Sequence, residues 1–267
     1  MNLADLFPEG DHRFSMRFQR GGVAEFFAPT EHHAGLIAER RRWLAESSEN
    51  YSVLLPEGEP LLEEMIELVR TWPQVLPRPE ASTAWDRCRT LGETLEPDFL
   101  LLKADVGGAF RLLGGCVCFP SSWSLAEKIG RPLDVIHNVV PGLNAALGSQ
   151  INSFLAGMKP GIAWLRANWG LSRSPELNQH PSRNLPKLDA TASLSEVWLR
   201  VERQALAVLP RHRGVLFGIR IETYDLAEMR LAGVVKGLAR ALRTMPEAMA
   251  QYKNLALAKE RILSLIE

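Results

Sequence analysis

The sequence of residues 198–223 is WLRVERQALAVLPRHRGVLFGIRIET. Apolar residues dominate both ends of this stretch, and a short basic segment with Pro210 and Gly214 separates them. Every second residue of the latter part is apolar: Val215, Phe217, Ile219 and Ile221. Because side chains alternate between the two faces of a strand, this spacing is typical of a half-buried strand. We therefore predict one strand over residues 198–209 and a second over residues 215–223.

A second pair of strands is predicted between residues 99 and 119. Phe99–Leu102 is a short apolar run, Gly107-Gly108 supplies a turn, and Phe110–Phe119 is again apolar. The pair Gly114-Gly115 lies inside the second of these strands. Glycine inside a strand indicates a bulge or a close approach to the backbone.

Helices are predicted before, within and after this set of strands. Apolar residues recur at helical spacing around residues 37–44 and 61–69, and again over residues 227–242 ahead of a last helix ending near Glu267. Pro141 is expected to begin another helix, whose apolar stripe continues to Met158. The predicted fold class is α+β, a small antiparallel sheet with flanking helices.

The stretch Val135–Met158 contains no Asp, Glu, Lys or Arg and has about the length that spans a bilayer. It also contains four amide side chains: Asn138, Asn144, Gln150 and Asn152. Those groups are costly in lipid, so we predict a buried segment of a soluble domain. The first residues carry acids and no apolar core, which argues against a signal peptide and favours a cytoplasmic protein without a membrane partner.

The overall charge is balanced, with 31 Lys and Arg against 31 Asp and Glu, and 46% of residues are hydrophobic. This composition is typical of a globular protein and argues against a nucleic-acid partner. Three cysteines do not form a disulfide framework and favour a reducing compartment. The run Arg40–Arg42 lies between Glu39 and Glu46, so we predict a solvated helix face and not a phosphate clamp.

Common catalytic signatures are missing from the sequence. It has no GxxxxGK[ST], GxGxxG, GxSxG or HExxH motif, so the P-loop, dinucleotide-binding, hydrolase and zinc-protease interpretations lose their main support. Cys116 and Cys118 have CxC spacing without a second pair, which is weak evidence for zinc. We predict that both are small buried core residues.

His137 is distinguished from the other histidines by its apolar neighbours. It lies about one turn before the helix predicted from Pro141, whose dipole would keep the imidazole neutral. A neutral, partly buried imidazole suits iron ligation, and the alternative is a core histidine bonded to a backbone carbonyl. His180 lies in a polar, proline-rich stretch, residues 172–195, predicted to be a long surface loop of the kind that forms lids.

Two arginines have an informative setting. Strand alternation places Arg203 on one face with Leu199, Val201 and Ala205. An arginine on an apolar face needs an anionic partner, which is either an internal carboxylate or a ligand group such as a propionate. The sequence Arg166-Ala167-Asn168-Trp169 likewise groups an arginine, an amide and a large aromatic ring.

Six ordered fragments carry a resemblance to a known family: residues 115–123 (GCVCFPSSW), 128–130 (KIG), 133–141 (LDVIHNVVP), 166–169 (RANW), 199–204 (LRVERQ) and 216–220 (LFGIR). Their order and spacing over about residues 95–225 resemble the haem-dependent oxidative N-demethylases, a bacterial group. A looser match continues at Phe7-Pro8, Arg13 and Met16.

The resemblance implies a PAS-like fold that holds b-type haem through a histidine. It also implies oxidation of an N-methyl group of a small secondary amine, such as dimethylamine, by O2 with release of formaldehyde. Electrons would come from NAD(P)H through separate flavin and iron–sulfur partners. The implied organisation is an N-terminal helical region (1–94), a haem-binding core (95–225) and C-terminal helices (226–267) that together form one compact unit. An oligomer is compatible with it.

Residue roles follow from the resemblance. His137 fills the histidine of an IHxPVP-like motif, with Val139 where that motif usually has proline, and His180 is the alternative iron ligand. Arg203 and Arg166 are the expected partners of the haem propionates.

Other positions keep two interpretations. Glu202 holds the cationic amine if its strand face lines the pocket, and otherwise pairs with Arg200 or a neighbour. Trp169 and Phe217 either flank the haem or fill the core. Cys118 as a thiolate ligand is a minor alternative. At the level of function the alternatives are a non-catalytic haem sensor and a haem-free scaffold subunit, because a fold does not fix a function.

Overall fold

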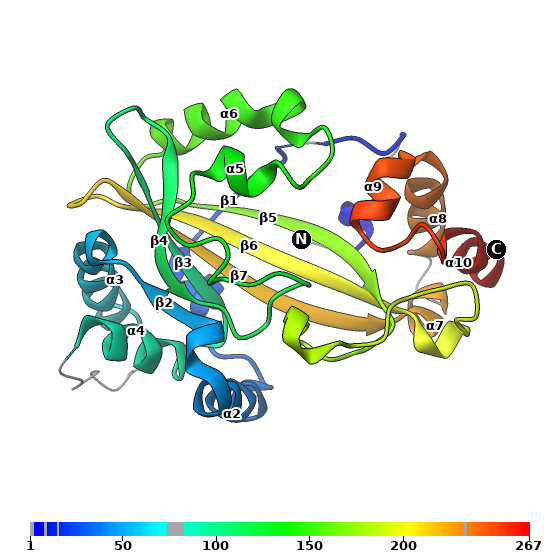
Figure 1. Ribbon diagram of the computed structural model, residues 1–267, viewed down its shortest axis with the longest axis horizontal. Coiled ribbons are helices and arrows are strands. Elements are labelled where there is room, and N and C mark those ends of the chain that lie inside the picture. The colour runs from blue at the N-terminus through cyan, green and yellow to red at the C-terminus, as the bar shows by residue number, and fades with distance from the viewer. Residues whose placement is uncertain (1–2, 8–9, 15, 74–82, 232–233) are drawn as a thin grey trace.

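The computed structural model describes residues 3–7, 10–14, 16–73, 83–231 and 234–267. Within them, one seven-stranded antiparallel sheet has the order β1-β5-β6-β7-β3-β4-β2 (Figure 1). The strands are β1 (Gln19–Gly21), β2 (Ser52–Leu54), β3 (Asp98–Ala104), β4 (Phe110–Cys116), β5 (Ala163–Ser172), β6 (Trp198–Leu209) and β7 (Gly214–Asp225). The predicted α+β class is confirmed.

Helices flank this sheet on several sides. They are α1 (Val23–Phe27), α2 (His33–Tyr51), α3 (Glu59–Arg70), α4 (Ala84–Gly92), α5 (Leu133–His137), α6 (Leu143–Gly157), α7 (Leu226–Leu231), α8 (Val235–Thr244), α9 (Glu247–Tyr252) and α10 (Lys259–Ile266). Figure 1 shows α5 and α6 together along one side of the sheet, and α8–α10 where the long strands β5–β7 end.

The two predicted strand pairs are confirmed. β6 and β7 pair along their whole lengths, from Trp198 opposite Asp225 to Leu209 opposite Gly214. β3 pairs with β4, and the register shifts between Leu101 and Leu102, as the glycine pair in β4 indicated. Because β3 also pairs with β7, the two hairpins join into one sheet.

Gly115 is required where β4 passes close to β3. Its φ is +151°, and a Cβ added there would lie 2.2 Å from the carbonyl oxygen of Phe99. We expect Gly115→Ala to lower the free energy of unfolding by about 2–4 kcal/mol, because it adds backbone strain and overpacks two paired strands. Urea unfolding measures the loss.

A matched control is Gly35→Ala in α2, where an added Cβ meets nothing within 4 Å. This change should leave stability equal or raise it by up to about 1 kcal/mol, through helix propensity. Equal stability of the two variants would contradict the close approach at Gly115.

Several predicted boundaries are wrong. The helix predicted from Pro141 begins at Leu143, with Gly142 at its N-cap. The single helix predicted over residues 227–242 is two helices, α7 and α8, with residues 232–233 outside the described residues. The final helix is likewise divided into α9 and α10. Strand β5 was not predicted. Pro8, which belongs to the looser family match, lies outside the described residues.

The uncharged stretch 135–158 is not the buried segment that was predicted. Only Leu155 and Met158 of this stretch are buried, whereas Val135 and Val139 are 45% and 54% exposed. The reason is that α5 and α6 lie outside the sheet: Ile151 and Phe154 pack toward the main core, whereas Ala145, Ser149 and Gln150 are exposed. No helix among the described residues combines the length and apolar character needed to cross a membrane.

The arginine run on α2 is a second correction. Arg41 and Arg42 are exposed, as predicted, but Arg40 is fully buried. Its guanidinium donates to the Asp98 carboxylate (Nη1–Oδ1, 2.6 Å) and to the Gly92 carbonyl (2.6 Å). Of the three consecutive arginines on α2, only Arg40 points into the core, where it forms an ion pair with the buried Asp98 at the start of β3.

Candidate functional site

One cavity of about 410 Å³ lies between α6 and the sheet. This volume is within the usual range of small-molecule sites. Its helical wall is apolar: Leu133, Val140, Leu143, Leu147, Ile151 and Phe154. The facing strands contribute Leu102, Leu206 and Phe217. The cavity is therefore shaped to take a largely apolar molecule.

The remaining wall comes from the chain ends. The described part of the N-terminal segment (residues 3–7, 10–14 and 16–18) contributes both apolar and charged lining residues, and α9 contributes Met249 and Tyr252 followed by Lys253. The segment is held by a ring contact between Phe7 and Trp169 (centroids 5.1 Å apart). At its other end, Phe18 stacks on Phe154 (4.3 Å, 6° between planes).

His137 lines this cavity from the end of α5. It is partly buried, and no described residue hydrogen-bonds its ring, so the backbone-carbonyl partner of a core histidine is not found among them. Burial lowers the pKa of His137, and the nearby positive charge of Arg166 lowers it further. The imidazole is therefore held neutral, with a ring nitrogen free to act as a ligand.

Two causes of that neutrality come from the tertiary structure. His137 is the last residue of the short helix α5, and its carbonyl accepts a hydrogen bond from the Val140 N–H in the turn that follows (2.9 Å). Burial and the charge of Arg166 favour the uncharged ring, and a contribution from the dipole of the following helix stays a prediction.

Arg166 also lines the cavity, from the middle of β5. Its guanidinium lies 5.8 Å from the ring centroid of Phe18, and no carboxylate of the described residues forms an ion pair with it. Burial lowers the pKa of Arg166, and Glu202 partly offsets this effect. A partly buried guanidinium has several N–H donors, and here they are left for a bound anion.

Trp169 and Phe217, for which two interpretations were open, both line the cavity. Trp169 lies on β5 and Phe217 on β7. Each ring also packs on protein neighbours, Trp169 against the N-terminal segment and Phe217 against the main apolar core. They are thus walls of the cavity and parts of the packing at once.

Glu202 lies on the β6 face that also carries Gln204 and Leu206, both of which line the cavity. Its carboxylate accepts a hydrogen bond from Gln204 Nε2 (3.2 Å). The charge of Glu202 raises the pKa values of Arg166 and Lys253 against the lowering effect of burial. Glu202 therefore supplies negative charge at the edge of the cavity, although its side chain is not one of the lining groups.

Arg200, the predicted alternative partner of Glu202, forms hydrogen bonds with other residues instead. It is 3% exposed and donates to Ser121 Oγ (2.7 Å) and to the carbonyls of Phe119 (2.8 Å) and Leu177 (2.6 Å). Burial lowers its pKa to about 10. This arginine ties two loops to the sheet and leaves Glu202 without an ion pair among the described residues.

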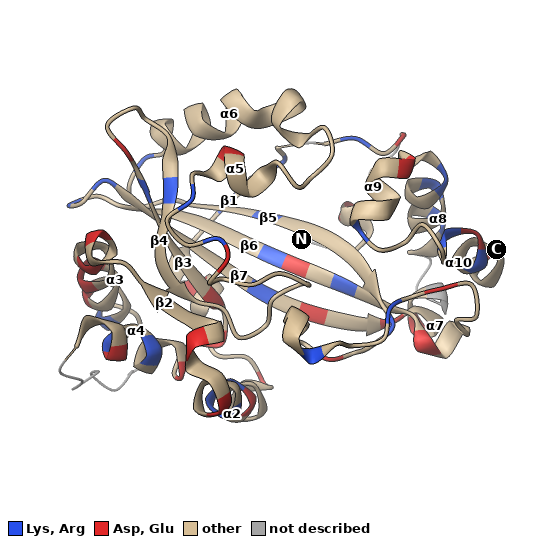
Figure 2. Ribbon diagram, in the orientation of Figure 1, with Lys and Arg blue, Asp and Glu red and all other residues tan. Residues whose placement is uncertain are grey.

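Arg203 lies on the opposite face of β6 and does not line the cavity. Its Nε donates to both carboxylate oxygens of Glu222 on β7 (2.7 and 2.8 Å). Tyr224 donates to the same carboxylate (2.6 Å). The structure therefore gives Arg203 the internal carboxylate that was the alternative to a propionate. Figure 2 shows charged residues gathered in the middle of β6 and β7.

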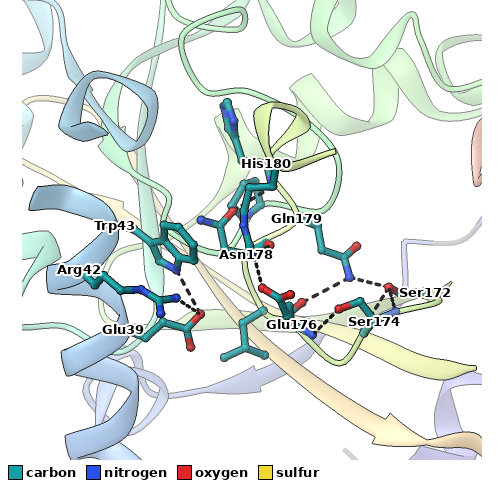
Figure 3. Close-up of polar contacts among 12 residues, drawn as sticks. Glu39, Arg42, Trp43, Ser172, Ser174, Glu176, Asn178, Gln179 and His180 are labelled. Atoms are coloured by element: carbon teal, nitrogen blue, oxygen red, sulfur yellow. Dashed lines mark hydrogen bonds and ion pairs between the residues drawn. The ribbon is translucent and has the colours of Figure 1, made fainter. Parts of the chain in front are cut away.

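His180 lies apart from the cavity, in the segment that follows β5 (Figure 3). The residue is 6% exposed, its Nδ1 contacts Ser182 Oγ (2.8 Å) and its ring meets the Tyr51 ring edge-on (5.5 Å). Burial lowers its pKa, and Nε2 has no hydrogen-bond partner in the described part of the chain. The structure does not bring His180 and His137 together.

The segment around His180 is not the predicted lid over the site. Figure 3 shows it facing α2, where Trp43 and Arg42 lie opposite Asn178 and His180. Asn178 is fully buried and donates to Tyr51 Oη (3.0 Å). No residue of the segment 172–195 lines the cavity. Residues 173–193 are a largely irregular segment with many exposed residues, as predicted, but the buried Asn178 and His180 make internal hydrogen bonds.

Cys116 and Cys118 are buried core residues, as predicted, and their Sγ atoms are 3.8 Å apart. Burial raises the pKa of Cys118, which disfavours the thiolate form that binds iron. Neither cysteine lines the cavity. The geometry gives no support to Cys118 as an iron ligand.

Lys253 and His12 are among the lining residues that sequence reasoning missed. Lys253 follows a short helix with no motif around it, and nothing local signals that its side chain points inward. His12 also lines the cavity, and its backbone N–H donates to Thr244 Oγ1 (2.8 Å). Both positions depend on contacts between distant parts of the chain.

The fold and the cavity together define an α+β protein whose cavity combines apolar walls with a neutral imidazole and with two cations, Arg166 and Lys253, that form no ion pair with the described residues. The family model described as haem-dependent oxidative N-demethylase, alpha subunit-like, matches residues 23–263. The chain belongs to this family. The description of the family indicates dependence on haem and membership of an assembly with other subunits.

Proposed function

We propose that this chain binds haem b in the cavity and serves as the oxygen-activating subunit of an oxidative N-demethylase. The observation that carries the proposal is the pairing of an unbonded, neutral His137 with an unpaired Arg166 between apolar walls. An imidazole for the iron, a cation for a propionate and apolar surfaces for the macrocycle are the groups that haem needs.

The residues present fit the cofactor. His137 would hold the iron, Arg166 would pair with a propionate, and Trp169 and Phe217 would lie against the macrocycle. The apolar residues of α6 would shield the same space from water. When bound, haem supplies the redox chemistry that activates O2, with electrons from separate flavin and iron–sulfur partners that take them from NAD(P)H. Arg203 has no part in this proposal because Glu222 already neutralises it.

The proposed substrate is a small secondary amine of the dimethylamine type, which is cationic at neutral pH. Glu202 is proposed to attract the cation, with Gln204 fixing the carboxylate through the 3.2 Å hydrogen bond. Oxidation places one atom of O2 on the N-methyl carbon, while two electrons and two protons reduce the other atom to water. The resulting N-hydroxymethyl amine then separates into formaldehyde and the demethylated amine.

A haem titration followed by a turnover assay tests this function. We expect the purified chain to take up haem with a Soret band that saturates at a one-to-one ratio. With the cognate reductase and NAD(P)H, formaldehyde should form when dimethylamine is added. Absence of a Soret band would favour the haem-free scaffold. Bound and reducible haem without formaldehyde from any small methylamine would favour the sensor.

A further inference from the structure

Lys253 presents an ammonium group at the end of the cavity formed by α9. Its Nζ donates to the carbonyl oxygen of Trp169 (2.7 Å) and lies 5.2 Å from the centroid of the Trp169 ring. The side chain is partly buried and lines the cavity, as does the neighbouring Tyr252. The ammonium is thus fixed in place by one backbone contact and one ring.

The protein does not supply an acceptor for every N–H donor of the Lys253 ammonium within the described residues. A lysine ammonium has further N–H donors beyond the one given to Trp169. No carboxylate of the described residues lies within the 4.0 Å that defines an ion pair with Nζ. Glu202 acts on Lys253 only through space: it raises the pKa, whereas burial, the larger effect, lowers it. A partly desolvated cation facing a cavity needs an anion there.

The neighbouring ring of His12 does not cancel the charge of Lys253. His12, on the N-terminal segment, also lines the cavity, and burial and then Lys253 lower its pKa, which favours the uncharged ring. Glu202 acts through space on both Lys253 and Arg166, two cations that line the cavity, so one negative charge from a ligand balances these three groups. A doubly charged phosphate would meet stronger repulsion from Glu202 than a carboxylate does.

We infer that Lys253 binds a carboxylate group of a molecule that occupies the cavity. The inference rests on the proposed function for the identity of that molecule, which is either the cofactor, through a propionate, or the substrate, through an amino-acid carboxylate. In the second case the substrate class would be N-methylated amino acids, whose ammonium Glu202 attracts while Lys253 holds the carboxylate.

Paired ligands with and without carboxylates test the inference. The first pair is metal-free protoporphyrin IX and its dimethyl ester, compared by fluorescence titration. The second pair is N-methylglycine and dimethylamine, compared by calorimetry on the haem-loaded chain. Lys253→Gln removes the charge, and Lys236→Gln, an exposed position on α8, is the matched control.

A wild-type preference for the carboxylate member of either pair is expected, and Lys253→Gln should reduce it by about 10- to 100-fold. Lys236→Gln should leave the preference unchanged, and Lys253→Arg should restore most of it. Loss confined to the porphyrin pair identifies the propionate as the ligand, and loss confined to the amine pair identifies the substrate carboxylate.

Two results would overturn the inference. One is a wild-type chain that binds both members of each pair equally well. This result is measured on the wild type alone, so it does not depend on whether a variant folds. The other is a folded Lys253→Gln chain, shown by an unchanged unfolding midpoint, that keeps the wild-type preference. If the wild type binds no porphyrin and no haem, the proposed function fails, but N-methylglycine titrated into the haem-free chain still tests Lys253.

Discussion

Replacing His137 by alanine is expected to weaken haem binding by about 100-fold or more and to remove the Soret band of the ligated form. Even groups that only orient a metal ligand typically change metal affinity by about 10- to 100-fold, so loss of the ligand itself should cost more. His180 lies outside the cavity, and His12, the other imidazole that lines it, is the neighbour of Lys253, whereas His137 is the neighbour of Arg166. Absorption titration of both proteins measures the difference.

The matched control is His180→Ala, which should leave the haem spectrum unchanged. If this variant loses the Soret band while His137→Ala keeps it, the ligand assignment is reversed. A folded His137→Ala chain that binds haem as the wild type does would refute His137 as the ligand.

The pH dependence of haem binding provides a second test of His137 as the ligand. Burial and Arg166 hold the pKa of His137 below its ordinary value of 6.5. Iron binds the neutral imidazole, so ligation should persist as the pH falls through 6.5 and weaken only when the lower folded pKa is reached. Because the unfolded chain takes up this proton first, the contribution of His137 to stability in the haem-free protein is present above pH 6.5 and declines below it.

Replacing Arg40 by methionine is expected to lower the free energy of unfolding by about 3–5 kcal/mol. The side chain is fully buried, and its 2.6 Å contact neutralises Asp98, which is 1% exposed. Removal of one partner leaves an uncompensated charge in the core, which is the costly way to break a buried ion pair. Urea unfolding of the wild type and the variant measures the loss.

Arg42→Met is the control, because it changes the same residue type on the same helix at an exposed position. Its effect should stay within about 1 kcal/mol, the range of exposed ion pairs and cation–π contacts. The double variant Arg40→Met with Asp98→Asn should recover part of the loss, because it removes the stranded carboxylate. Equal losses for Arg40→Met and Arg42→Met would contradict the buried role of Arg40.

Local patterns account for what was predicted correctly. The alternation in β7 and the glycine turn between β3 and β4 are encoded within a few residues, and both hairpins follow from them. β5 was missed because its residues 163–172 mix apolar, charged and amide side chains without clean alternation. Its strand character comes from pairing with β6 on one side and, over residues 163–165, with β1 on the other.

The candidate site was predicted in part for the same reason. His137 was found from its apolar neighbours in the sequence, and Arg166 and Trp169 from the fragment they share. Lys253 was not found, since its partner Trp169 lies 84 residues earlier in the chain. Arg40 was placed on the solvated face because the sequence run does not show which of its members turns inward.

By itself the sequence determined the α+β class, the two strand pairs, the histidine at the cavity and membership of the N-demethylase family. These features depend on residue types that lie a few positions apart in the sequence, so they can be recognised without the tertiary structure. Only the tertiary structure decided which charges are neutralised: Arg203 by Glu222, Arg40 by Asp98, and Arg166 and Lys253 by no carboxylate of the described residues. Charge pairing requires contact between side chains far apart in the sequence, and that contact is set by the packing of strands and helices.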